Sequence, residues 1–169
     1  YFPRVLLPAS LVIAGLSELM VTFALFLVVS GLIYGHAPSL NMLWLPVPLL
    51  LLMMTTAGFS IWLAALSVSF RDVRQAAGYI LQMLMFLAPV IWPLSLLAQR
   101  FGIAADSWLL KGGAALYPMV AVIEGFRRVL LGGPMPWDLL GFGFISASLL
   151  LVGGMFYFHR CERRLADGI

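Results

Sequence analysis

Four long apolar runs constrain the fold of this chain more than any other feature of its sequence. Residues 42–70, 76–98 and 139–158 hold no charged side chain, and residues 5–33 hold one. Each run supplies the roughly 20 apolar residues that an α-helix needs to cross about 30 Å of hydrocarbon. Helices are favoured over barrel strands, because the runs are continuous rather than alternating and lipid requires internal backbone hydrogen bonding. The sequence therefore predicts an all-α integral membrane protein with four transmembrane helices.

The overall composition supports this class and excludes several others. The chain is 63% hydrophobic and 10% charged, whereas a soluble domain is about half apolar and a quarter charged. Its net charge of +3 is typical of a membrane protein with Lys and Arg in cytoplasmic loops, so no nucleic-acid partner is predicted. The single cysteine excludes an intrachain disulfide, and the sequence has no HExxH, glycine-rich phosphate loop or Ser-His-Asp arrangement. We therefore predict no catalytic, metal-binding or cofactor-binding residues in this chain.

Basic residues indicate the orientation in the membrane. The first loop on the opposite side, "YGHAPSLN", has no Lys or Arg. The basic residues close to the other span ends are Arg4, Arg71, Arg74, Arg160, Arg163 and Arg164. Because cytoplasmic loops carry an excess of Lys and Arg, both ends of the chain are predicted to be cytoplasmic. The long segment 99–138 on the outer side holds four further basic residues, which reduces the difference in basic residues between the two sides.

The segment between the third and fourth runs is predicted to contain a short helix. Residues 119–131 lie between Pro118 and the "GGP" at residues 132–134, and 13 residues make only about 20 Å of helix. Such a helix lies at the outer interface or re-enters the membrane. Glu124 and Arg128 are four residues apart and are expected to pair on one face. Upstream, Pro89 and Pro93 are expected to break or bend the third span at its outer end.

Two charged features have more than one interpretation. Glu18 is the one carboxylate deep in a span, where a charge costs several kcal/mol unless it is paired. It is either protonated, paired with a polar group on a neighbouring helix, or part of a translocation path. The turn "FRDVRQ" holds Arg71, Asp72 and Arg74. It is either an ordinary cytoplasmic turn, in which Asp72 complements the helix dipole, or a docking point for a cytoplasmic motor.

Four stretches of the chain occur in the order typical of a known family. They read "YFPRVLLPAS" at residues 1–10, "LSVSFRDVRQAAGYILQMLMFLAPVIWPLS" at residues 66–95, "LYPMVAVIEGFRRVLLGG" at residues 116–133 and "RCERRLADGI" at residues 160–169. In this order they resemble the permease subunits of type-2 ABC exporters, and most closely the branch that exports O-antigen, capsule or teichoic-acid polysaccharides. Ala88, Trp92 and Tyr117 stand where the pattern of that branch has Ser, Tyr and Asn.

The resemblance implies an architecture and a set of partners. The chain would be the C-terminal two thirds of a permease, which agrees with its opening at Tyr1 rather than at a Met. Two permeases would form a homodimer with two ATP-binding cassette subunits, which bind the ATP and Mg²⁺. The complex would lie in the bacterial inner membrane, with the C-terminus of the permease cytoplasmic, and would move a lipid-linked glycan outward.

The resemblance also assigns candidate site residues. Arg71, Asp72 and Arg74 would form a coupling loop, and Glu18 would be a channel or buried polar residue. Residues 89–134 would form an outer gate with re-entrant helices. The candidate gate residues are Pro89, Trp92, Pro93, Tyr117, Pro118, Glu124, Arg127 and Arg128.

Other functions stay open at this point. The same fold could export a drug, a lipid or another amphiphile. A membrane-embedded enzyme would require clustered polar catalytic residues at one membrane face, and a purely structural membrane module would not co-purify with an ATP-binding subunit.

The aromatic residues also have two interpretations. They are either anchors at the bilayer edges or surfaces on which sugar rings stack.

Overall fold

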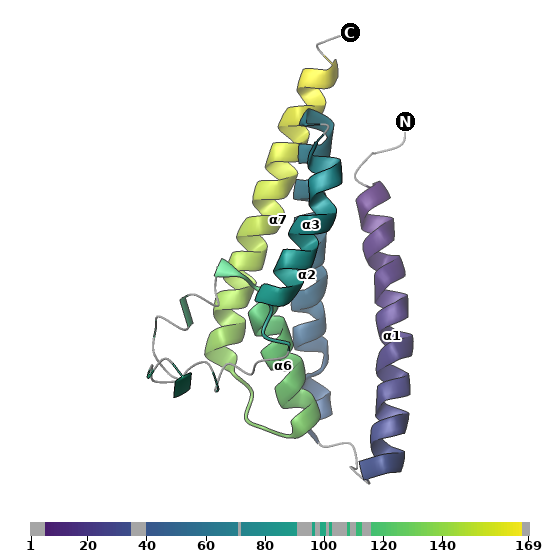
Figure 1. Ribbon diagram of the computed structural model, residues 1–169, viewed down its shortest axis with the longest axis vertical. Coiled ribbons are helices and arrows are strands. Elements are labelled where there is room, and N and C mark those ends of the chain that lie inside the picture. Colours follow the sequence, from purple (N-terminus) through teal and green to yellow (C-terminus); the bar gives the residue numbers. More distant parts are fainter. Residues whose placement is uncertain are drawn as a thin grey trace.

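The described part of the chain is helical. The computed structural model describes residues 6–34, 40–70, 72–90, 96, 99–100, 102, 108, 111–112 and 116–166. Its elements are α1 (Leu6–Tyr34), the 3-10 helix η1 (Leu40–Trp44), α2 (Pro46–Ser69), α3 (Val73–Leu87), α6 (Met119–Leu131) and α7 (Trp137–Ala166). None of the described residues lies in a β-strand, which confirms the predicted all-α fold (Figure 1).

Three helices are long and apolar enough to cross a membrane. They are α1, α2 and α7, and they coincide with the predicted spans 5–33, 42–70 and 139–158. The predicted third span, residues 76–98, starts within α3. That helix has 15 residues, which correspond to about 22 Å. Residues 91–95 and 97–98 of the predicted span lie outside the described residues.

The end of α3 is the predicted break in the third span. The helix stops at Leu87, and Ala88 has an extended backbone with φ −68° and ψ 132°. Ala88 precedes Pro89, and the proline ring disfavours the helical conformation for the residue before it. The sequence therefore determines this helix end locally.

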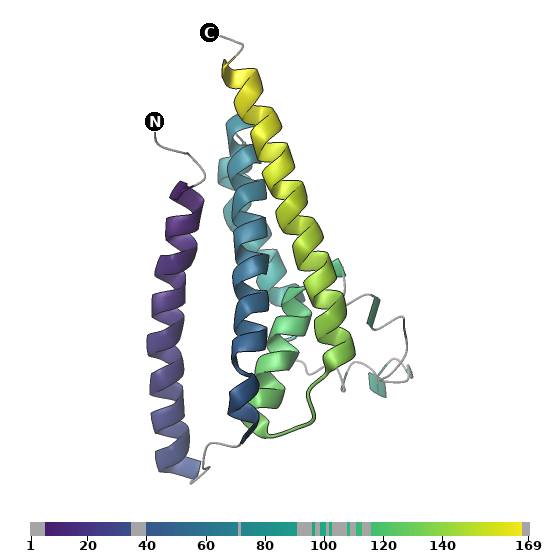
Figure 2. The same cartoon turned by 180° about the vertical axis from the view of Figure 1, so that it is seen from behind.

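The helices form a bundle in which neighbours alternate in direction along the chain. α1 and α3 run one way, and α2 and α7 run the other (Figures 1 and 2). The first turn of α1, the connection from α2 to α3 and the last turn of α7 therefore lie at one end, which we call the terminal end. The short helix α6 lies beside the first halves of α2 and α7, toward the opposite end, which we call the far end.

The tightest packing joins α2, α6 and α7. Gly143 of α7 sits against α6 and α2, because a Cβ at this position would lie 2.7 Å from the Cβ of Ala121 and 3.0 Å from Cδ2 of Leu51. Small residues allow helix backbones to approach closely in this way. The buried residues of this core are Leu51, Val120, Ala121, Val122, Leu139, Leu140 and Ala147. The core therefore fixes α6 in the bundle.

Aromatic residues join α2 and α7 nearer the terminal end. The indole N–H of Trp62 donates to the carbonyl of Leu150 at 3.0 Å. The same ring stacks on Tyr157, with 5.2 Å between the ring centroids. These contacts join the second half of α2 to the middle and the second half of α7.

Helix α1 lies at the edge of the bundle. Beside α2 it borders a cavity of about 340 Å³, lined by residues such as Leu16, Leu19 and Met53. Phe23 of α1 also faces Phe126 of α6, with ring centroids 6.4 Å apart. The opposite face of α1 is exposed along its length, as Val21, Leu25 and Leu32 show.

Candidate functional site

The candidate site is built around α6, whose two ends are determined locally. Pro118 precedes the helix and is fully buried. Gly132 ends it in the left-handed conformation with φ 77°, which glycine adopts without a steric penalty. The amides of Gly132 and Gly133 both donate to the carbonyl of Arg128, at 3.1 and 3.2 Å. The bounds of α6 are those predicted from the sequence, 119–131.

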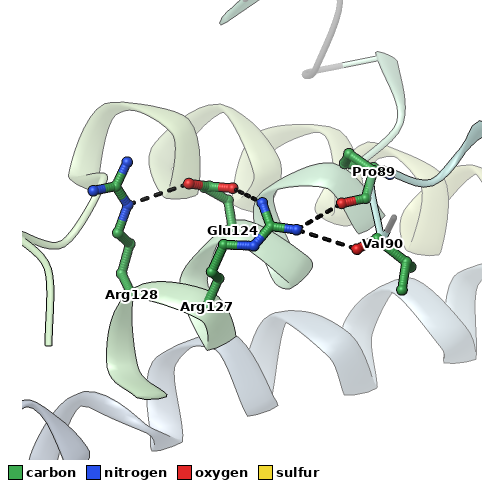
Figure 3. A network of polar contacts seen from close by, with 5 residues as sticks. All are labelled: Pro89, Val90, Glu124, Arg127 and Arg128. Atoms are coloured by element: carbon green, nitrogen blue, oxygen red, sulfur yellow. Dashed lines mark hydrogen bonds and ion pairs between the residues drawn. The ribbon is translucent and has the colours of Figure 1, made fainter. Parts of the chain in front are cut away.

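A buried carboxylate on α6 holds two arginines. Glu124 is 6% exposed. Its Oε2 accepts from Nη1 of Arg127 at 2.6 Å, and its Oε1 accepts from Nε of Arg128 at 3.2 Å (Figure 3). The pairing of Glu124 with Arg128 was predicted from the four-residue spacing and is confirmed. The shorter pair with Arg127, three residues away, follows from the same helical geometry, but it was not among the predicted pairs.

Arg127 connects this cluster to the broken end of α3. Its Nη2 donates to the carbonyl of Pro89 at 2.9 Å and to that of Val90 at 3.4 Å (Figure 3). Carbonyls outside a regular helix have no helical amide to accept from, and they need other partners when they are buried. Pro89 is buried. The guanidinium of Arg127 therefore links α6 to the residues that directly follow α3.

Tyr117 makes a second connection to α3. Its hydroxyl donates to the carbonyl of Leu84 at 3.3 Å, and its ring meets that of Phe59 edge-on, with centroids 6.3 Å apart. Burial raises the pKa of the Tyr117 phenol above its ordinary value of 10.0. The hydroxyl therefore keeps its proton, and its capacity to donate, at neutral pH.

These residues form one unit, which we call the α3–α6 clamp. It consists of the donors Tyr117 and Arg127, the carboxylate of Glu124, and the carbonyls of Leu84, Pro89 and Val90. The donor Tyr117 lies just before α6 and the donor Arg127 lies within it. The acceptors lie in the last turn of α3 or just beyond it. A movement of α3 away from α6 must break these hydrogen bonds, so the clamp can control whether the two helices separate.

The remaining candidate gate and coupling residues are placed only in part. Trp92, Pro93 and Arg71 lie outside the described residues. Asp72 is exposed at the start of α3, where its carbonyl accepts from the amides of Gln75 and Ala76 at 3.1 and 3.0 Å. Arg74 lies in the first turn of the same helix. This turn belongs to the terminal end, so it does not join the α3–α6 clamp (Figure 1).

Glu18 lies on the exposed side of α1. Its backbone carbonyl accepts from the hydroxyl of Thr22 at 2.9 Å. Its carboxylate forms no ion pair with any residue in the described part of the chain. Its predicted role as a channel or buried polar residue stays a prediction.

Comparisons with known proteins relate the chain to membrane transporters. The family described as "ABC-2 type transporter" matches residues 2–131. The O-antigen export system permease protein RfbA of Myxococcus xanthus is 29% identical over 163 residues, covering 95% of this chain and 60% of that protein. A protein of the same name from Klebsiella pneumoniae is 22% identical over 167 residues, covering 98% of this chain and 61% of its own length. The chain thus spans about three fifths of these relatives. No solved structure gives a significant match.

Proposed function

The chain belongs to the ABC-2 type transporter family, and we propose that it is the transmembrane permease subunit of an ATP-driven exporter of polysaccharide or lipid-linked glycan. The relatives that match 95% and 98% of the chain are named as O-antigen export permeases, which supports this class of substrate. A family of membrane transporters also indicates a transport role rather than catalysis.

The proposal extends to the assembly. Two such permeases form a homodimer with two ATP-binding cassette subunits, which bind and hydrolyse ATP with Mg²⁺. The complex lies in the bacterial inner membrane, with the terminal end of the bundle cytoplasmic and the far end facing outward. The basic residues near the terminal end support this orientation, because positive charge is retained on the cytoplasmic side.

The observation that carries the proposal is the α3–α6 clamp in a membrane-spanning bundle. In the proposed transporter the clamp is the closed form of an outer gate. Its principal contact is the hydrogen bond from Arg127 to the carbonyl of Pro89, 2.9 Å long. Hydrogen bonds from charged groups contribute about 1.5–3 kcal/mol. A gate held by one or two of them is stable at rest, but a rearrangement of the permease dimer can still open it.

Deletion of the gene tests the proposed function directly. We expect the deletion strain to lose surface polysaccharide and to accumulate the lipid-linked glycan in the cytoplasm, because synthesis continues without export. The measurement is the distribution of glycan between the cell surface and the cytoplasm, with a plasmid-borne copy of the gene as the control. Normal surface glycan in the deletion strain would contradict the proposal.

The proposed coupling loop has a separate test. The double substitution Arg71→Ala with Arg74→Ala is expected to lower export and to weaken the dependence of ATP hydrolysis on substrate, while insertion in the membrane stays normal. The matched control is Arg160→Ala with Arg163→Ala, which removes the same charge from α7 at the same end of the bundle. Coupled export at the normal rate in the first variant would show that the loop does not transmit the work of the ATPase.

A further inference from the structure

Arg128 uses only part of its hydrogen-bonding capacity within the described part of the chain. Arg127 directs one terminal nitrogen to Glu124 and the other to the end of α3. Arg128 engages Glu124 through Nε alone, and its Nη1 and Nη2 donate to no described residue. Figure 3 shows both terminal nitrogens of Arg128 pointing away from the carboxylate. The side chain is 39% exposed, so a ligand can reach these donors from outside.

The protein supports this guanidinium on two sides. Glu124 holds it on one side. On another side it lies over a glycine, because a Cβ added at Gly133 would be 2.9 Å from Cδ of Arg128 and 3.1 Å from its Nη1. A larger residue at Gly133 would displace the guanidinium. A long side chain held in this way loses little further entropy when it binds a ligand.

The surroundings of Gly133 place Arg128 near the boundary of the bilayer. The side-chain amide of Asn41, a residue of η1, donates to the carbonyl of Gly133 at 3.0 Å. The last residue of η1, Trp44, meets Trp137 edge-on with ring centroids 4.8 Å apart, and both indoles are about half exposed. Tryptophan is enriched where hydrocarbon meets water. Trp44 precedes the start of the spanning helix α2 by two residues, and Trp137 is the first residue of the spanning helix α7. From these tryptophans and helix starts we infer that Arg128 lies at the depth of the lipid headgroups.

The charge balance of the site favours an anion. Two arginines face one carboxylate, so Glu124, Arg127 and Arg128 together carry a net charge of +1 (+2 − 1). The nearby Asp138, which follows Trp137, is paired with Lys111 at 2.8 Å. The two free nitrogens of a guanidinium match two oxygens of a phosphate group in a bidentate contact. We propose that the guanidinium of Arg128, which lies over Gly133, is a binding site for the phosphate group of an anionic membrane lipid.

This site would tie α6 to the bilayer. Arg128 lies in the last turn of α6, and the same helix carries Arg127 of the α3–α6 clamp. A lipid phosphate on Arg128 therefore restrains the helix that is linked to the segment after α3. The inference requires only that the far end lies at a membrane surface, so it can fail while the proposed export function holds, and the reverse is also true.

Native mass spectrometry of the full-length protein tests the proposal. Purified wild type and Arg128→Gln are titrated with phosphatidylglycerol in detergent, and the lipid that remains bound is counted. We expect the variant to retain one lipid fewer than wild type. Its affinity for that lipid should be at least about tenfold lower, since a contact to a charged group is removed. Glu124 keeps Arg127 as its partner in this variant, so the protein is expected to fold.

Controls separate a specific phosphate site from general attraction to a cationic protein. Arg100→Gln removes another exposed arginine and should leave the bound lipid unchanged, whereas Arg128→Lys should bind with intermediate strength. A neutral glycolipid without phosphate should not occupy the site. Equal lipid retention by wild type and Arg128→Gln, or equal binding of the neutral glycolipid, would overturn the proposal. Competition by inorganic phosphate would assign the site to phosphate in general, and lack of competition would assign it to membrane lipid.

Discussion

Replacing Glu124 with alanine is expected to lower the free energy of unfolding by about 3 kcal/mol and to release the end of α3 from α6. The carboxylate is 6% exposed and is the acceptor for two arginines. Its removal leaves Arg127, which is 20% exposed, without its anionic partner in a largely buried position. We place the effect at the lower end of the range for broken buried pairs, because both arginines keep some access to water.

Two other variants identify the cause of this loss. Glu124→Gln keeps the shape and one carbonyl acceptor, so its effect should lie between wild type and Glu124→Ala. Arg128→Gln removes the more exposed partner and should lower stability by less than about 1 kcal/mol. The measurement is thermal unfolding of the purified protein in detergent. A cysteine pair that joins Ala88 to α6 would report the separation of the helices. Unchanged stability in Glu124→Ala would show that the cluster does not hold α3 and α6 together.

Short-range sequence signals predicted the ends of α6, one of its ion pairs and the end of α3. Pro118 and Gly132 mark the ends of α6, because a proline can precede the first turn and a glycine can adopt the left-handed conformation after the last. The four-residue spacing of Glu124 and Arg128 predicted their pairing. The end of α3 followed from the effect of Pro89 on Ala88. In each case the cause lies within a few residues of its effect.

The contacts between α6 and α3 could not be predicted in the same way. Arg127 and Pro89 are 38 residues apart, and Tyr117 and Leu84 are 33 apart. Nothing in the spacing of these residues says that one donates to the carbonyl of another. The contacts depend on how α6 packs on α2 and α7, which is decided by shape at positions such as Gly143. The position of Glu18 within an apolar run likewise marked it as a residue of interest. It did not predict that Glu18 lies on the exposed face of α1.

That packing leads to the second large expected effect. Replacing Gly143 with leucine is expected to lower the free energy of unfolding by about 3 kcal/mol. A Cβ at this position would lie 2.7 Å from the Cβ of Ala121, and a Cβ can move only with its backbone. Ala121 and Leu51 are both fully buried, so α6 would have to shift away from α7. The same shift would change the position of Arg127 relative to α3.

Gly141→Leu is the matched control for Gly143→Leu, because it lies two residues away on the same helix. A Cβ at Gly141 would meet no atom within 4 Å. Leucine favours a helix over glycine by about 0.5–1 kcal/mol at either position, so Gly141→Leu should be as stable as wild type or slightly more stable. The difference in unfolding free energy between the two variants therefore isolates the packing of α7 against α6. If both variants unfold at the same temperature, the close approach at Gly143 does not position α6, and the α3–α6 clamp must be held by its polar contacts alone.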